Sequence, residues 1–315
     1  MQAKGELQSL LQVASMYYKE HLNQQEIADK MGVTRQTVNR MLKKAEAEGI
    51  VEFRIHNPLE ILADSGEKLA AKFGLKRAVV VPCRFRDTEM VTNAISYYAS
   101  QYITQLIEDG AQNIGLSWGR TVYHSVVNLP ASYCDQAVFF PLVGASNQTA
   151  EYFMINEIVR NAASTLNAKA VYTYIPADPG SAEDAKLFRH TKVYETIAGY
   201  WNNIDLAIMG IGTNPIYGRG DRASYPGEEY IIDAMLNDAV GDILTHYFDA
   251  KGHFLMQDEE HILCASIDNL SSAKRVLALA GGKSKLMAIF AALKTGIITD
   301  IVTDELVCDS LLKMR

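Results

Sequence analysis

Residues 23–53, NQQEIADKMGVTRQTVNRMLKKAEAEGIVEF, decide the first part of the fold. Apolar side chains recur in this stretch at the spacing of helix faces that pack together: Ile27, Ala28, Val33, Val38 and Leu42. Gly32 supplies a turn between two short helices, and Gly49 ends the second helix. The stretch therefore predicts a helix-turn-helix.

The free face of the second helix is polar and basic. It presents side chains that can contact a nucleic acid, with the first of them as the N-cap: Thr34, Arg35, Gln36, Thr37, Asn39, Arg40, Lys43 and Lys44. Gln, Asn and Arg read base edges, whereas Lys and Arg neutralise phosphates. Residues 50–55 then alternate as a short strand, consistent with a wing. We expect a winged helix-turn-helix DNA-binding domain over residues 1–56; the alternative is an ordinary helical hairpin with a solvated charged face.

The charge balance of this first domain bears on how it holds DNA. Residues 1–56 contain eight Lys and Arg against seven Asp and Glu, so one copy would bind phosphates weakly. We therefore expect a dimer or larger assembly on a roughly palindromic operator. Since the whole chain carries a formal net charge of −7 and residues 1–56 carry +1, the remainder carries −8, which argues against DNA running over it.

Composition excludes several classes of protein. The four cysteines are scattered without a C-x-x-C pair and are expected to be free thiols in a reducing cytoplasm. No apolar run approaches the roughly 20 residues that cross a bilayer, and no secretory signal is present, so we expect a cytoplasmic protein without a membrane partner. The histidines lack metal-ligand spacing, and no G-x-S-x-G occurs, so neither a metal nor a catalytic serine is expected.

Residues 57–315 have the pattern of one large α/β domain. Helices are expected at 59–73, 122–128 and 286–293. Runs with β-branched content alternate with segments long enough for helices: 78–82, 113–117, 137–144, 168–176, 205–212 and 297–305. Such alternation predicts a mostly parallel sheet. Tyrosines at 17, 18, 97, 98 and 102 recur at helical spacing and are expected to pack in the core or at subunit contacts.

Three loops suit a ligand: two follow predicted strands, the third opens a predicted helix, and free N–H groups at helix starts favour anions. They are residues 117–121 (SWGRT), 210–215 (GIGTNP) and 280–285 (AGGKSK). Arg120 and a hydroxyl suit a phosphate or polyol in the first loop, and a lysine opens the helix after the third. The second is a weak signal that a plain turn explains equally well, and solvated lysines are the alternative for the third. Asp242 and Asp249 could accept hydrogen bonds from sugar hydroxyls or could cap turns.

The ordered set of motifs resembles one family. The helix-turn-helix, SWGRT (117–121), DLAIMGIG (205–212), GDILTHYFD (241–249) and LALAGGKSKLMAIFAALKTGIITDIVTDE (277–305) look like the SorC family of bacterial sugar-responsive transcriptional regulators, whose namesake is a sorbose (sorbitol) operon regulator. The resemblance implies a Rossmann-like effector domain similar to glucosamine-6-phosphate isomerase, no cofactor, and a tetramer.

The resemblance also implies effector contacts by position. These fall on Ser117, Trp118, Gly119, Arg120, Thr121, Asn147, Gln148, Gly212, Asp249 and Lys285. Trp118 and Arg120 depart from the small residues and paired threonines of some family members that bind phosphorylated sugars, which leaves the effector's phosphate open. Trp118 could instead stack on the apolar face of a sugar ring.

Two functions compete with a sugar-gated regulator that binds sorbose, another ketose or a ketose phosphate. One is a sugar-phosphate isomerase or kinase with an appended DNA-binding module, for which Asp249 and His253 are the nearest acid–base pair. The other is an architectural DNA-binding protein without a ligand, which conflicts with the glycine-rich loops. Whether the effector activates or releases the operator is not encoded in these motifs.

Overall fold

The computed structural model describes residues 2–20, 22–51, 62–84, 87–147, 150–213, 238–255 and 262–314. The chain divides into two compact units, residues 1–57 and 58–315. Among the described ranges, no helix is long and apolar enough to span a membrane. The four cysteines are free thiols, as expected.

The first unit contains three helices, α1 (Gln2–Tyr18), α2 (Gln24–Met31) and α3 (Arg35–Ala47). Gly32 ends α2 in the left-handed conformation, with φ of +66°, and Gly49 after α3 has φ of +71°. The predicted core is confirmed, because Ile27, Ala28, Val38 and Leu42 are buried together. Helix α1 was not expected from the sequence; its Val13 joins this core, and its Leu10 and Ala14 pack with Ala45 of α3 in a second cluster. The predicted wing lies largely outside the described residues, which end at Val51 in this unit.

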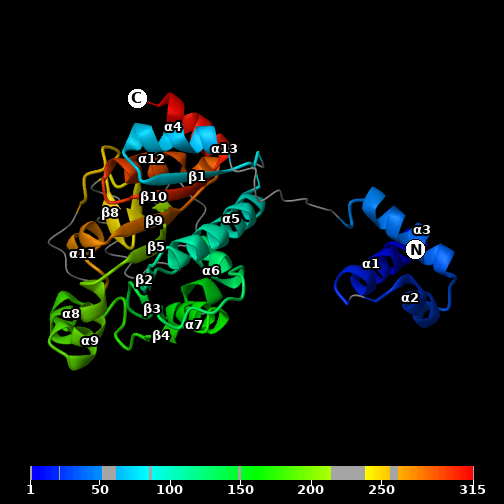
Figure 1. The fold of residues 1–315 in the computed structure, drawn as a ribbon, viewed down its shortest axis with the longest axis horizontal. Coiled ribbons are helices and arrows are strands. Elements are labelled where there is room, and N and C mark those ends of the chain that lie inside the picture. Colours follow the sequence, from blue (N-terminus) through cyan, green and yellow to red (C-terminus); the bar gives the residue numbers. More distant parts are fainter. Residues whose placement is uncertain are drawn as a thin grey trace. The chain divides into compact units, whose positions relative to one another are not determined.

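The second unit is built on a parallel sheet of seven strands in the order β1-β10-β9-β5-β2-β3-β4 (Figure 1). These strands are β1 (Arg77–Val81), β2 (Asn113–Leu116), β3 (Val138–Pro141), β4 (Lys169–Ala170), β5 (Leu206–Gly210), β9 (Arg275–Leu279) and β10 (Asp300–Asp304). A small antiparallel sheet joins β6 (Gly212–Thr213), β7 (Gly241–Ile243) and β8 (His246–Phe248). The predicted parallel α/β fold is thus confirmed.

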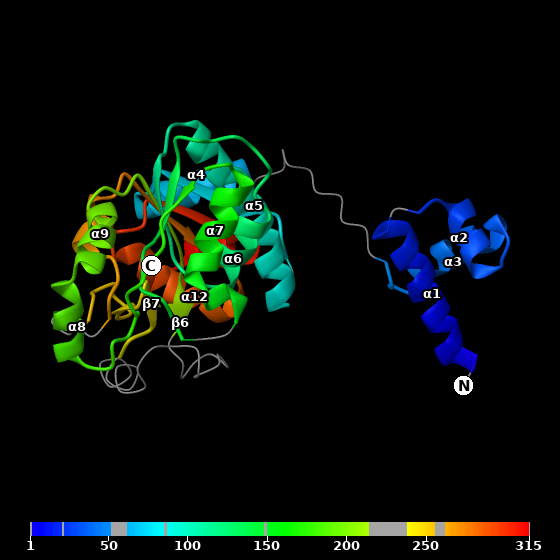
Figure 2. The ribbon, with the colours of Figure 1, turned by 90° about the horizontal axis from the view of Figure 1, so that it is seen from below.

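Helices cover both faces of the large sheet, as right-handed crossovers require (Figures 1 and 2). Helices α5 (Thr88–Glu108), α6 (Arg120–Val127) and α7 (Ile155–Thr165) lie together on one face. The 3₁₀ turn η1 (Glu151–Phe153) directly precedes α7. The remaining elements are α4 (Ala63–Phe73), α8 (Ala182–Arg189), α9 (Lys192–Trp201), α11 (Ile267–Ser272), 3₁₀ turn η3 (Lys283–Lys285), α12 (Leu286–Lys294) and α13 (Glu305–Lys313). Of these, α4, α12 and α13 lie together on the other face.

One predicted strand needed correction, and one strand and one hairpin were missed. The run 168–176 forms only the two-residue edge strand β4, because the Asn156 side chain takes both backbone groups of Thr173, at 2.9 and 3.0 Å. Strand β9 was not expected, since its residues were taken only as the start of a motif. The hairpin β7–β8 was also missed, because its strands are too short to show an alternation.

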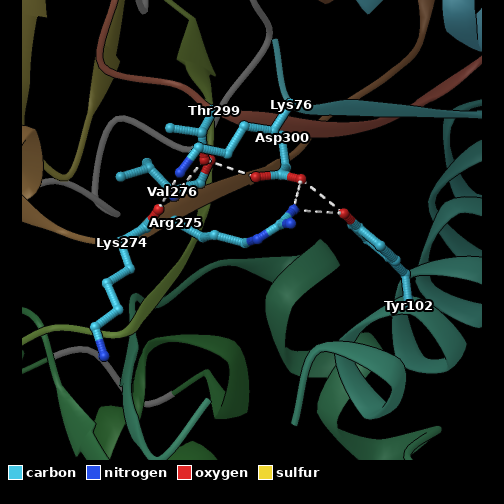
Figure 3. A network of polar contacts seen from close by, with 7 residues as sticks. All are labelled: Lys76, Tyr102, Lys274, Arg275, Val276, Thr299 and Asp300. Atoms are coloured by element: carbon cyan, nitrogen blue, oxygen red, sulfur yellow. Dashed lines mark hydrogen bonds and ion pairs between the residues drawn. The ribbon is translucent and has the colours of Figure 1, made fainter. Parts of the chain in front are cut away.

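A buried polar network fixes the amino ends of β9 and β10 to α5 (Figure 3). Asp300 is fully buried and its Oδ1 accepts hydrogen bonds from Arg275 and from the Tyr102 hydroxyl, each at 2.6 Å. The Thr299 hydroxyl donates to Oδ2 at 2.6 Å. Burial and the hydrogen bond to Asp300 raise the pKa of Tyr102. Tyr102 therefore packs in the core, which was one of the two predicted locations for these tyrosines; the other was a subunit contact.

Candidate functional site

The candidate site lies at the carboxyl edge of the large sheet, where the strand order reverses. From β2 the chain proceeds outward to β3 and β4, and it then returns to β5 on the other side of β2. Ligands of open α/β sheets bind in the crevice at such a switch point. The Ser117 N–H donates to the Ile208 carbonyl at 2.9 Å, which fixes the loop after β2 to strand β5 there.

The first loop, residues 117–121, is held by backbone contacts and packed rings. Ser117 is buried, and its hydroxyl donates to the Trp118 carbonyl at 2.9 Å. Gly119 adopts φ of +124°, and its N–H donates to the Tyr152 carbonyl at 2.7 Å. Trp118 is half-buried and meets Phe153 edge to face, with centroids 6.0 Å apart. The loop is therefore ordered by the chain itself.

Arg120 and Thr121 begin helix α6 at this loop. Gly119 is the N-cap, and no side chain caps this helix start within the described part of the chain. Uncapped N–H groups at a helix start favour an anion. The exposed Arg120 guanidinium lies 5.3 Å from the centroid of the Tyr152 ring, and the Thr121 carbonyl accepts from the Ser125 hydroxyl at 2.7 Å. The loop thus offers a cation beside a polar helix start.

Lys285 lies in the third loop, where the backbone at Gly281 passes close to the Asp304 side chain. A Cβ at Gly281 would lie 2.5 Å from Asp304 Oδ2, and the Gly282 N–H donates to the same oxygen at 2.7 Å. The half-buried Lys285 then directs its Nζ to the Ile211 carbonyl, at 2.7 Å. Burial lowers the pKa of Lys285, the positive charge of Arg120 lowers it further, and the carboxylate of Asp242 opposes both. Arg120 and Asp242 therefore lie within electrostatic reach of Lys285.

Asp242, on β7, is the carboxylate of this group. It is only 7% exposed, and its Oδ2 accepts from the Thr245 N–H at 3.2 Å. Its Oδ1 has no hydrogen-bond partner among the described residues. Burial raises the pKa of Asp242 to about 6, although the charges of Lys285 and His246 lower it. A buried acceptor without a donor is costly, and a ligand hydroxyl would satisfy it.

The predicted contact Asp249 has a different environment. Its Oδ1 accepts from the N–H groups of Lys251 and His253, at 2.8 and 2.9 Å, and its Oδ2 lies 3.2 Å from His253 Nδ1. The carboxylate therefore caps the turn 249–253, which was the alternative the sequence left open. The sequence also suggested Asp242 as an acceptor for sugar hydroxyls, but the family resemblance did not place it among the effector contacts. The sequence signal for Asp242 was its place as the one carboxylate in the apolar run 239–248.

Of the other predicted contacts, seven lie at the ends of adjacent strands, one is exposed after β3, and one lies outside the described residues. Ser117, Trp118, Gly119, Arg120, Thr121, Gly212 and Lys285 lie at the ends of the adjacent strands β2, β5 and β9. Gly212 pairs with Asp242 in the small sheet. Asn147 is exposed after β3, and Gln148 lies outside the described residues. Tyr152, beneath Arg120, was not expected, because nothing in the local sequence links it to the first loop.

In the first unit, helix α3 presents the predicted polar face. The Thr34 hydroxyl accepts from the Thr37 N–H at 3.2 Å, which confirms the N-cap. The exposed residues of the face are Thr34, Arg35, Gln36, Asn39, Arg40 and Lys43, whereas Thr37 and Lys44 are half-buried. Lys44 lies 3.6 Å from Glu48 on the same helix. The face thus keeps two arginines, Lys43 and two amides in contact with solvent.

Comparisons with known proteins agree with this arrangement. Residues 57–313 match the family described as "Putative sugar-binding domain", and residues 9–78 match the Crp-like helix-turn-helix domain. The sorbitol operon regulator of Klebsiella pneumoniae is 28% identical over 99% of this chain and 100% of its own length. The deoxyribonucleoside regulator of Bacillus subtilis (strain 168) is 27% identical over 94% of each chain.

A solved structure matches over nearly the whole chain. The crystal structure of the full-length sorbitol operon regulator SorC from Klebsiella pneumoniae has a TM-score of 0.75 at 28% identity, covering 98% of this chain and 99% of that one. These relatives are regulators, which favours regulation over the sugar-phosphate isomerase alternative.

Proposed function

The chain belongs to the SorC family of sugar-binding transcriptional regulators, and we propose that it controls a sugar catabolic operon in response to a ketose or ketose phosphate. The observation that carries the ligand part is the pairing of opposite charges at the switch point. Lys285 and Arg120 offer cations for a phosphate, and Asp242 Oδ1, which no described residue contacts by a hydrogen bond, offers an acceptor for a hydroxyl. Sorbose or its phosphate is the effector we favour, since the sorbitol operon regulator is similar over its whole length.

We assign Trp118 to the apolar face of the sugar. An aromatic ring beside a polyol site supplies dispersion contact with the C–H groups of the ring, while the polar groups fix its orientation. The half-buried Trp118 is already positioned by Phe153, so little order is lost when a ligand contacts it. Ser117, Gly119, Thr121 and Gly212 supply the small, polar walls of the site.

We assign the exposed face of α3 to operator DNA. Arg35, Gln36, Asn39 and Arg40 carry side chains that read base edges in the major groove, while Lys43 and Lys44 neutralise phosphates. Because one copy carries so little net positive charge, a homo-oligomer is needed, and we propose a tetramer acting in the cytoplasm. The proposed assembly has two arrangements that differ in the spacing of its DNA-binding helix pairs. The effector shifts operator affinity because it binds these two arrangements unequally. A tenfold change in operator affinity takes only about 1.4 kcal/mol of that difference.

Direct titration of the purified full chain tests the ligand half of the proposal. Isothermal titration calorimetry with sorbose, fructose, sorbitol and the corresponding phosphates should show one ketose or its phosphate binding with a clear preference. Lys285→Met, which removes the ammonium, should abolish any preference for the phosphorylated form. Lys283→Met is the matched control, since Lys283 is exposed in the same 3₁₀ turn. Equal, negligible heats for all six compounds would contradict the proposal.

A further inference from the structure

Cys264 and His246 form a thiol–imidazole pair that the effector contacts above do not use. Cys264 Sγ lies 3.6 Å from His246 Nε2 and 3.7 Å from the Thr245 hydroxyl. Cys264 is half-buried, so the residue is partly open to solvent. Its backbone bridges Val143 beyond the end of β3, and His246 begins β8, so two separate segments bring the pair together.

The turn that carries both partners of the thiol is conformationally unusual. Leu244 and Thr245 form the two-residue loop between β7 and β8, with φ of +51° and +69°. Asparagine and glycine are the residues that usually occupy such a loop, and a β-branched residue at positive φ is an outlier. Strain of this kind concentrates at functional positions. Here the turn is what points the Thr245 hydroxyl and the His246 ring at the sulfur.

The hydrogen bonds of His246 fix where its proton lies. Nε2 is 2.8 Å from the Ala265 carbonyl, and a carbonyl oxygen only accepts, so Nε2 carries a hydrogen. The Nε2–H is shared between that carbonyl and Sγ at 3.6 Å, and the Thr245 O–H can donate to Sγ from 3.7 Å. Two donors stabilise a thiolate over a thiol.

The charges around the pair act in the same direction. The charges of Arg189 and His246 act on the sulfur, and the charge of Asp242 acts on the imidazole. Burial raises the pKa of Cys264, but the charge of His246 and its hydrogen bond lower it more, so the net shift is downward. Burial lowers the pKa of His246, but the negative charges of Cys264 and Asp242 and the bond to Ala265 raise it to about 9. The arrangement therefore resembles the environment of reactive cysteines.

We propose that Cys264 is a nucleophilic thiol, activated by His246 and Thr245, which hydrogen peroxide oxidises to a sulfenic acid. The thiolate sulfur attacks one peroxide oxygen, an S–O bond forms, and the O–O bond breaks. The sulfur loses two electrons to the peroxide, and the leaving hydroxide takes the proton of the His246 imidazolium to become water. The modification site does not rest on the sugar-binding proposal, because Cys264, His246 and Thr245 are not among the assigned effector contacts.

Alkylation of the full chain tests the proposal without any effector. Iodoacetamide labelling from pH 6 to 9, read by mass spectrometry at each cysteine, should give Cys264 at least a tenfold higher rate at pH 7 than Cys134. Cys134 is the internal control, since it is also half-buried and forms no hydrogen bond with a histidine in the part of the chain that the structure describes. The Cys264 rate should level off at a lower pH than that of Cys134. Peroxide followed by dimedone should label the same residue first.

Two variants test whether a high alkylation rate of Cys264 comes from its hydrogen-bond partners or only from its exposure to solvent. His246→Gln and Thr245→Val should each slow alkylation of Cys264 while leaving Cys134 unchanged, with the larger effect, about tenfold or more, at His246. Equal rates at Cys264 and Cys134 in the unmodified chain would overturn the proposal, as would a Cys264 rate that neither substitution alters. If His246→Gln fails to fold, Thr245→Val and the pH profile of the unmodified chain still decide.

Discussion

The Lys285 ammonium donates a hydrogen bond to the Ile211 carbonyl at 2.7 Å, one residue before Gly212. The cation of the third loop is therefore bound to the backbone of the second, at the point where β5 passes into β6. This bond holds Lys285 in place before any anion arrives, so little side-chain entropy is lost on binding. Opposite it, Asp242 lies on β7, paired with β6. The site is thus assembled from loops distant in sequence but adjacent in the sheet.

Removing the Lys285 charge should weaken effector binding without loss of operator binding. A hydrogen bond to a charged group contributes about 1.5–3 kcal/mol, so Lys285→Met should raise the effector dissociation constant about tenfold or more. Calorimetry and operator anisotropy on the same preparation measure both. Lys283→Met should change neither. Loss of operator binding along with the effector response would show that Lys285 is structural.

Asp242→Asn should weaken effector binding yet stabilise the free protein. The folded-state pKa of Asp242, about 6, lies above its ordinary value of 3.8, so the ionised carboxyl is disfavoured by folding. That penalty is absent below about pH 3.8, grows between pH 3.8 and 6, and is complete above. At pH 7.5 the substitution should therefore raise the free energy of unfolding by up to about 3 kcal/mol, measured by urea denaturation. Unchanged stability together with unchanged effector affinity would contradict this role.

Effector affinity should depend on pH through the same group. If the ionised Asp242 accepts a hydroxyl, affinity for an unphosphorylated ketose should fall as pH drops through about 6. Asp242→Asn should flatten the profile between pH 5 and 7.5. An unphosphorylated sugar is the proper ligand here, because a phosphate ester titrates in the same range. Identical profiles in the two proteins would assign the dependence to another group.

Arg40→Ala should reduce operator affinity by about 1–3 kcal/mol and lower the slope of affinity against salt if the contact is to a phosphate. Anisotropy at three salt concentrations measures both effects. Lys19→Ala removes the same charge from an exposed position just after α1 and is the matched control. Equal effects of the two substitutions would mean that net charge, rather than the α3 face, governs binding.

Asp300→Ala should destabilise the large unit. It leaves Arg275 and Tyr102 without their acceptor, and breaking a buried pair costs about 3–5 kcal/mol; the lower end applies because the Arg275 side chain is 36% exposed. Urea denaturation of the full chain measures the change. Lys192→Ala breaks the exposed pair with Glu195, at 3.0 Å, and should have little effect. If Asp300→Ala lowers the free energy of unfolding no more than the control variant does, the network contributes little to stability.

Local patterns account for what the sequence predicted well. The stripe of Val38 and Leu42, the turn at Gly32 and the cap at Thr34 depend on neighbours within a few residues, and they appear as expected. The parallel sheet followed from alternating apolar runs. Asp242 and the pairing of Lys285 with Ile211 could not be derived in this way, because they depend on contacts between segments 40 to 75 residues apart, such as the separation of 74 for that bond. The short hairpin β7–β8 likewise carries too few residues for a periodic signal.

The most direct test of the account is the response of the operator complex to sugars. Duplexes enriched by the purified chain from a random library provide the operator, and fluorescence anisotropy at fixed salt follows its release or tightening. The account predicts that one ketose or its phosphate shifts the affinity at least tenfold, that Lys285→Met loses the shift, and that Lys283→Met keeps it. Operator affinity that is unaffected by sorbose, sorbitol, fructose and their phosphates would contradict a sugar-gated regulator.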